Sequence, residues 1–103
     1  MTAIVVGTTP TIVYNFKSVA PSDITTAVLT IKKAGSIVLT KDLTDAEVAE
    51  SSISWTLTQS ETLAIGIGDA EMMLNWVTNQ GVRGIGKKEM VTFIRNHITE
   101  VMT

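Results

Sequence analysis

The chain has 103 residues, enough for one domain with a sizeable buried core, and we assign residues 1–103 to a single domain. Only 17% of the residues are charged, against about 25% in an average soluble domain, and the formal net charge of −2 provides no basic footprint for a nucleic-acid backbone. The absence of cysteine excludes disulfides and thiolate metal sites.

The chain begins with residues 1–7, which contain a short apolar run at positions 3–6. They carry no basic leader, and the run is too short for the core of a signal peptide. No stretch approaches the ~20 apolar residues of a membrane-spanning helix. We therefore expect a soluble, unexported chain with no membrane partner, and residues 3–6 could form an exposed sheet edge.

Alternation of apolar and other residues predicts β-strands along most of the chain. After a turn at residues 7–9, the expected strands lie at 12–16, 25–33, 36–41, 53–58 and 70–78. The second and third of these flank Ala34 and Gly35, a spacing typical of a β-hairpin. Residues 19–23 form a connector around Pro21, and residues 79–81 form a turn.

Two short helical turns are also expected between strands. Thr44 stands three residues before Glu47, the spacing of a capping box, so residues 44–48 are predicted to form one or two helical turns or a tight loop. Residues 60–63 are predicted to form another turn of helix, and Gly66 and Gly68 lead from it into the strand at 70–78.

The closing residues, 87–103, fit either a helical face or a strand. We favour a strand up to about Asn96, because residues 91–94 are β-favouring neighbours that crowd a helix interior. Strand or helix stays open for residues 97–103. Together, these elements predict an all-β fold, an immunoglobulin-like antiparallel β-sandwich of about seven strands with one or two short helical turns.

The strands carry more apolar residues than a two-layer sandwich can bury, since each sheet hides only one face. We place the even-numbered residues of the strand at 70–78 inside, and likewise Met90 and Ile94 of the last strand. Scattered surface apolar residues are the ordinary alternative. We instead infer an interface with copies of the chain or with a larger assembly. Its candidate residues are Ile4, Val5, Val6, Met73, Val77, Val91 and Phe93.

No motif indicates chemistry. Residues 81–88 fit a phosphate-binding loop except at the final position, where Lys88 replaces the Ser or Thr that would ligate magnesium, so a glycine-rich hairpin is expected. His97 has no second histidine or cysteine to complete a metal site. The carboxylates Asp42, Asp45, Glu47 and Glu50 lack the spacing of a calcium loop. We predict a protein that is not an enzyme and has no catalytic residue, cofactor or bound metal.

Trp55 and Trp76 lie in the middle of predicted strands on apolar faces. Core packing is therefore the favoured role for both. If either strand were phased the other way, its indole would face outward and could stack on a sugar. This keeps a host-surface glycan-binding module as the alternative function.

Three stretches resemble a known family. They are Thr9-Pro10-Thr11 ahead of a strand, residues 57–63 after the Trp55 strand, and residues 74–81 ahead of a closing strand that ends in residues 98–102. Together they resemble small structural proteins of tailed bacteriophages and prophages, and more distantly the immunoglobulin-like N-terminal domains of phage baseplate proteins. These motifs are structural and carry no active site to transfer.

The resemblance implies a virion protein that is assembled in the bacterial host cytoplasm. We expect a non-enzymatic component that decorates the capsid or sits at the neck, tail or baseplate. Its expected partners are other virion proteins and further copies of itself, with no nucleic acid and no membrane. Low charge, abundant Thr and Ser, and spare apolar faces suit a module that is held by many weak contacts.

Overall fold

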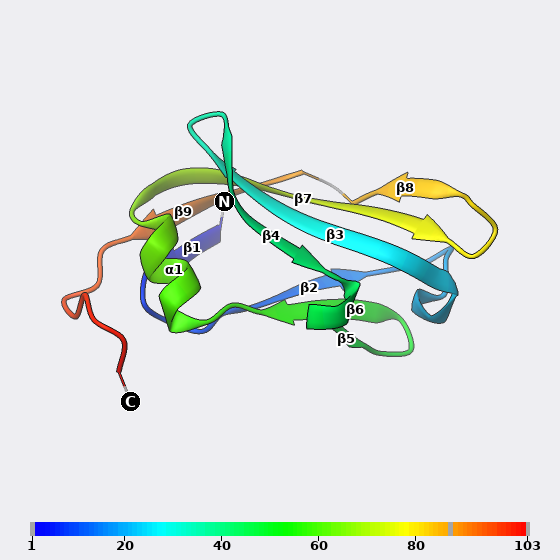
Figure 1. Ribbon diagram of the computed structural model, residues 1–103, viewed down its shortest axis with the longest axis horizontal. Coiled ribbons are helices and arrows are strands. Elements are labelled where there is room, and N and C mark those ends of the chain that lie inside the picture. Colours follow the sequence, from blue (N-terminus) through cyan, green and yellow to red (C-terminus); the bar gives the residue numbers. More distant parts are fainter. Residues whose placement is uncertain (1, 87, 103) are drawn as a thin grey trace.

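The computed structural model describes residues 2–86 and 88–102 and places two β-sheets face to face (Figure 1). The prediction of an all-β, immunoglobulin-like sandwich is confirmed, with nine strands in the described residues instead of about seven. The larger sheet contains β1 (Thr2–Val5), β9 (Glu89–Ile94), β7 (Gly68–Thr78), β3 (Ile24–Lys33) and β4 (Ser36–Asp42) in that order, with β8 (Arg83–Ile85) also paired to β7. The smaller sheet contains β2 (Thr11–Asn15), β6 (Ser52–Thr56) and β5 (Glu47–Val48) in that order.

The neighbouring strands pair antiparallel with one exception, the parallel pair β1 and β9. β1 lies at the end of the larger sheet, so the expected exposed edge near residues 3–6 is present. β9 pairs with the first half of β7 and β8 with the second half, while β3 pairs along the other side of β7. The two long strands β3 and β7 therefore form the centre of the larger sheet.

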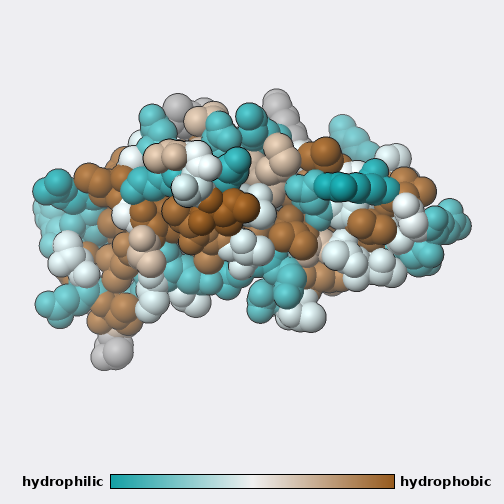
Figure 2. All heavy atoms as spheres, turned by 45° about the horizontal axis from the view of Figure 1, so that its top comes forward, coloured by the Kyte–Doolittle hydropathy of each residue, from teal (hydrophilic) through white to brown (hydrophobic). Residues whose placement is uncertain are grey.

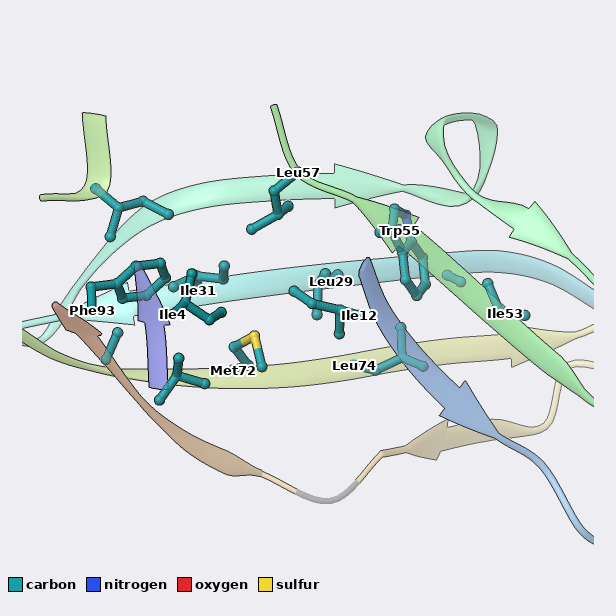
Figure 3. Close-up of a cluster of buried hydrophobic side chains, with 14 of the residues drawn as sticks. Ile4, Ile12, Leu29, Ile31, Ile53, Trp55, Leu57, Met72, Leu74 and Phe93 are labelled. Atoms are coloured by element: carbon teal, nitrogen blue, oxygen red, sulfur yellow. The ribbon is translucent and has the colours of Figure 1, made fainter. Parts of the chain in front are cut away.

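The core fills the space between the two sheets (Figure 3). The larger sheet contributes Leu29, Ile31 and Leu74, and the smaller sheet contributes Ile53 and Trp55, all of them at most 1% exposed. The strands at 53–58 and 70–78 were thus predicted in the correct phase. The indole Nε1 of Trp55 donates a hydrogen bond to the backbone oxygen of Asp42 at 2.9 Å, which satisfies its polar edge inside the core.

The predicted hairpin is confirmed. β3 and β4 are joined by Ala34 and Gly35, whose φ angles are 53° and 82°, as a two-residue hairpin turn requires. Only the second position is a glycine, so Ala34 adopts a left-handed conformation that costs a non-glycine residue some free energy.

The helical turn expected at residues 60–63 is confirmed as α1 (Gln59–Ile65). Thr58 caps this helix. Its hydroxyl accepts a hydrogen bond from the backbone N–H of Glu61 at 3.1 Å, and the Glu61 carboxylate accepts one from the backbone N–H of Thr58 at 2.8 Å. Two 3₁₀ turns, η1 (Pro21–Asp23) and η2 (Leu43–Asp45), complete the short helical elements.

The capping box predicted from Thr44 to Glu47 is wrong. The box at this place is shifted by two residues, with Asp42 as the cap of η2 and Asp45 as its partner. Glu47 instead opens β5 and pairs with Ser54 in the smaller sheet, which removes it from any helix. The hydrogen bonds from Thr44, led by that of its side-chain hydroxyl, lower the pKa of Asp42 below its ordinary value.

The last strand is confirmed, but its predicted phase is wrong. Val91 and Phe93 face the core at 0% and 1% exposure, while Met90 and Ile94 face outward. The reason lies in the partner strand β7, where Gly68 pairs with Phe93 and Ala70 with Val91. Two small residues of β7 leave room for two large ones of β9, and the opposite phase would leave that space empty.

Lysines of the β3–β4 hairpin hold α1 against the sandwich. Lys41 Nζ lies 2.6 Å from a carboxylate oxygen of Glu61, and both side chains are mostly buried. Lys33 Nζ donates to the backbone oxygen of Ile65 at 2.8 Å, where a positive charge also favours the carbonyl end of the helix. Two of the hairpin lysines are therefore used in tertiary contacts.

Thr62 is the one fully buried polar side chain of α1. Its hydroxyl accepts a hydrogen bond from the backbone N–H of Gly7 at 2.8 Å and donates to the backbone oxygen of Thr8 at 2.9 Å. Gly7 has a φ of 79°, so the bend that follows β1 depends on a left-handed glycine and on this hydroxyl.

Replacing Thr62 with valine tests this anchor. Thr62→Val keeps the volume but leaves the N–H of Gly7 and the oxygen of Thr8 without a protein partner, so we expect the free energy of unfolding to fall by about 1–3 kcal/mol. Urea denaturation measures the change. The exposed Ser60→Ala on the same helix should stay within about 0.5 kcal/mol of the wild type, and an equal loss in both variants would contradict the assignment.

The Lys41–Glu61 pair predicts a pH-dependent stability. Burial opposes ionisation of Glu61, but the hydrogen bonds from Lys41 and Thr58 outweigh it and lower the pKa below its ordinary 4.5. Because the pKa of Glu61 is lower in the folded state, its ionised carboxylate stabilises the fold above about pH 4.5. This stabilisation is lost as the pH falls through the folded-state pKa. Glu61→Gln, which can keep the capping box, should therefore lower the free energy of unfolding at pH 7 and have little effect at pH 3. Equal losses at both pH values would contradict this.

Candidate assembly surfaces

The outward face of the larger sheet carries an apolar patch. The pairing registers place Val28 of β3 and Met73 and Val77 of β7 on this face, and all three are half-buried. Toward the β1 edge, Val5 pairs with Ile94, which continues the apolar surface across β1 and β9. We call this set the outer patch; it consists of Val5, Val28, Met73, Val77, Met90 and Ile94.

The outward face of the smaller sheet is different, because most of its side chains are small and polar. Thr11 pairs with Thr56, and their hydroxyl oxygens lie 3.0 Å apart. Ser52 and Ser54 follow on the same face, and Val13 is the apolar exception at 52% exposure. The outward face of the smaller sheet is therefore rich in hydroxyls, whereas that of the larger sheet is mixed, with Glu71 and Asn75 beside its apolar side chains. The larger sheet, with more large apolar side chains, is the candidate for protein contacts.

Figure 2 turns the larger sheet toward the viewer and shows apolar groups gathered in clusters between polar ones. Charged and polar residues lie beside and between the members of the outer patch. Arg83 donates to the side-chain oxygen of Asn75 at 3.3 Å, and Lys88 lies 3.8 Å from Glu71. An apolar patch with a polar surround is the usual arrangement of a protein-binding surface.

The structure divides the seven predicted interface residues into two groups. Val5, Met73 and Val77 lie on the outer patch as expected. The prediction is wrong for the four that form part of the core. Ile4, Val91 and Phe93 face inward from β1 and β9, and Val6 is buried in the turn after β1; their exposures are Ile4 7%, Val6 6%, Val91 0% and Phe93 1%.

Sequence reasoning also missed Val28, Met90 and Ile94. Val28 alternates with the buried Ala27 and Leu29, so its outward position could have been found from the period of β3. Met90 and Ile94 were missed because the phase of β9 was inverted. Each is 42% exposed, so the apolar surplus that was inferred exists, with these two residues in place of Val91 and Phe93.

Trp76 lies at the margin of the core and is covered from two directions. Gly84 pairs directly with it on β8, and a Cβ atom at Gly84 would lie 2.0 Å from the indole Cζ2. Phe16 packs edge-on against the indole, with ring centroids 5.9 Å apart. Trp55 is 0% exposed. Trp55 therefore has no open face for stacking on a sugar, and Trp76 is half-buried between Gly84 and Phe16.

The stretch at 81–88 forms a strand and close-packing contacts. Gly84 belongs to β8, and a Cβ at Gly86 would lie 3.1 Å from both Leu74 and Tyr14. The expected glycine-rich hairpin is present as far as Ile85, where β7 and β8 pair. The next described element is β9, not a helix. Lys87 lies outside the described residues.

His97 is exposed in the segment after β9. Within residues 2–86 and 88–102, no group of three or more His, Cys, Asp or Glu side chains is close enough to hold a metal ion. In the same described ranges, no helix has the length and apolar character needed to cross a bilayer.

The chain matches no protein-family model, and comparisons with curated proteins and with solved structures found no match either.

Gly84→Ala tests the close contact with Trp76. The added methyl group must displace the indole, so we expect a loss of about 1–3 kcal/mol in the free energy of unfolding and a change in tryptophan fluorescence. In a Trp76→Val background the clash is removed, so the same substitution should cost much less in a double-mutant cycle. Additive effects in this cycle would contradict the contact.

Proposed function

We propose that this chain is a non-enzymatic structural component of a tailed-phage particle, which acts through protein–protein contacts as a capsid decoration, neck, tail or baseplate accessory protein. The observation that carries this proposal is the outer patch, a set of apolar side chains on the sheet face opposite a hydroxyl-rich one. The resemblance to phage virion proteins suggests that these contacts form in a phage particle. It rests on residues 9–11, 57–63, 74–81 and 98–102.

The outer patch suits many weak contacts rather than one strong one. Its central residues Val28, Met73 and Val77 are half-buried within the chain, so a partner removes only part of each side chain from water. In a symmetric particle, many copies of such a contact act together, and the assembly becomes far stronger than each contact alone. A hydroxyl-rich opposite face limits association to one side of the sandwich.

Glycan binding is not included in the proposal. It would need an accessible indole face; Trp55 is buried, and Trp76 is half-buried, with Gly84 and Phe16 packed against its ring.

Charge substitutions on the two faces test the outer patch. Met73→Asp and Met90→Asp place a carboxylate inside the apolar contact, so we expect at least a tenfold weaker self-association or particle binding. The matched control Thr56→Asp puts the same charge on the outward face of the smaller sheet and should change association by less than about twofold. Size-exclusion chromatography with light scattering measures the association, and urea denaturation confirms that each variant folds.

The particle location is tested separately. Mass spectrometry of purified particles from the phage or prophage that encodes the chain should find it at a stoichiometric copy number. A chain that is monomeric at high concentration and absent from those particles would contradict the proposed function.

A further inference from the structure

The two sheets differ in width, and the difference leaves one side of the sandwich open. The larger sheet continues past β2 with β8, β9 and β1, whereas the smaller sheet ends at β2. An open groove lies along β2 as two adjoining hollows of about 400 and 270 Å³. Both hollows are lined by Val13 and Glu89, which mark the middle of the groove.

Inward-facing apolar side chains form the floor of this groove. One hollow is lined by Leu74, Trp76 and Phe16, and the other by Ile4 and Met72. Ile4, Met72 and Leu74 are core residues that are at most 7% exposed, and Phe16 and Trp76 are half-buried. The hydroxyl of Tyr14, at the groove wall, is buried and has no hydrogen-bond partner among the described residues. Burial, with the nearby Glu89 carboxylate, raises the pKa of Tyr14 to about 12, so this hydroxyl stays a proton donor.

The backbone of β2 has hydrogen-bonding groups free on the groove side. The backbone N–H of Phe16 donates to the Ser51 oxygen at 2.8 Å, and the N–H of Leu57 donates to the Pro10 oxygen at 2.9 Å. In an antiparallel pair every second residue bonds to the partner strand, so these two bonds show which β2 residues bond to β6. Even-numbered residues of β2 therefore bond to β6. The N–H and C=O groups of Thr11, Val13 and Asn15 point into the groove.

β2 also lacks the features that protect the edges formed by β4 and β5. β5 has two residues, and β4 follows an irregular register with β3 at Ile31/Lys32. β2 has five residues with no charge, proline or register shift. Such an edge is a template for one more strand.

We propose that this groove binds an extended strand from a second copy of the chain, supplied by the segment that follows β9. Residues 95–102 belong to no helix or strand, and the hydrogen bond from Asn96 to the Val6 oxygen, 2.8 Å, marks where the segment leaves the fold. Ile98, Val101 and Met102 are 46%, 48% and 61% exposed. The backbone of Met102 makes two hydrogen bonds with the side chain of Gln59.

The groove fits one strand and not a whole second sheet. Because β8, β9 and β1 continue beneath the space beside β2, a second sandwich that paired its own β2 there would bring two larger sheets into the same space. A single segment lies on this floor without such a clash.

The side-chain spacing of the segment matches the two hollows. In an extended strand Ile98 and Met102 point the same way about 13 Å apart, one for each hollow.

The test uses the full chain, a chain that ends after Asn96, and a synthetic peptide of residues 95–103. We expect the full chain to associate with increasing concentration and the shortened chain to do so at least tenfold more weakly. The peptide should bind the shortened chain and change the fluorescence of Trp76, which lines the groove. A peptide with Ile98→Asp and Met102→Asp should bind at least tenfold more weakly.

A second variant tests the backbone edge. Val13→Pro removes a free N–H on the groove side without breaking a β2–β6 bond, and it should weaken peptide binding at least tenfold. Val13→Thr keeps the N–H and the β-branched shape, so it should bind normally. Should Val13→Pro fail to fold, the peptide titration of the shortened chain decides the question alone.

The inference goes beyond the proposed function and does not depend on it. A full chain that is monomeric at every concentration, equal association with and without residues 97–103, or a peptide that does not bind the shortened chain would overturn it. Association that is abolished by Met73→Asp but unchanged by the shortening would support the outer patch and overturn the groove. The opposite pattern would support the groove and contradict the outer patch.

Discussion

The unequal width of the two sheets is the constraint on which the rest of the structure depends. Three strands cannot cover six, so the smaller sheet buries the middle of the larger one, and the margins need other cover. At one margin, α1 supplies it, held by the lysines of the β3–β4 hairpin and by the buried hydroxyl of Thr62. At the β2 margin the described chain supplies no further strand. Tyr14, Phe16 and Trp76 are left half-buried there, and the hydroxyl of Tyr14 is without a partner.

Within the larger sheet, size matching between neighbouring strands decides how the side chains pack. β7 carries Gly68 and Ala70 where β9 presents Phe93 and Val91, and Trp76 where β8 presents Gly84. At these three positions of β7, a small residue of one strand thus faces a large residue of the next. Because no Gly84 side chain intervenes, the indole of Trp76 can lie over the backbone of β8, an arrangement known to compensate for a glycine in a strand.

Local pattern was enough to predict most of the fold but not its long-range pairings. The strand at 70–78 could be phased because Glu71 and Asn75 mark one face as polar, and the hairpin could be placed because only Ala34 and Gly35 separate two alternating runs. β9 has apolar residues on both faces, so its phase depends on which β7 residues it meets, and the sequence alone does not contain that information. The groove along β2 follows from strand order and sheet width, so no local pattern could predict it.

The two surfaces differ in the symmetry that they allow. Two outer patches can meet face to face, so this contact can be isologous and closes as a pair. When a segment of one copy enters the groove of another, two different surfaces meet, so the contact is heterologous. Such a contact repeats from copy to copy, and it forms either a closed ring or an open line. Rings and stacked lines are the geometries of necks, tails and baseplates, whereas pairs alone are not. The groove and the outer patch on one chain would therefore link copies in two directions, as a module in a repeating shell or tube requires.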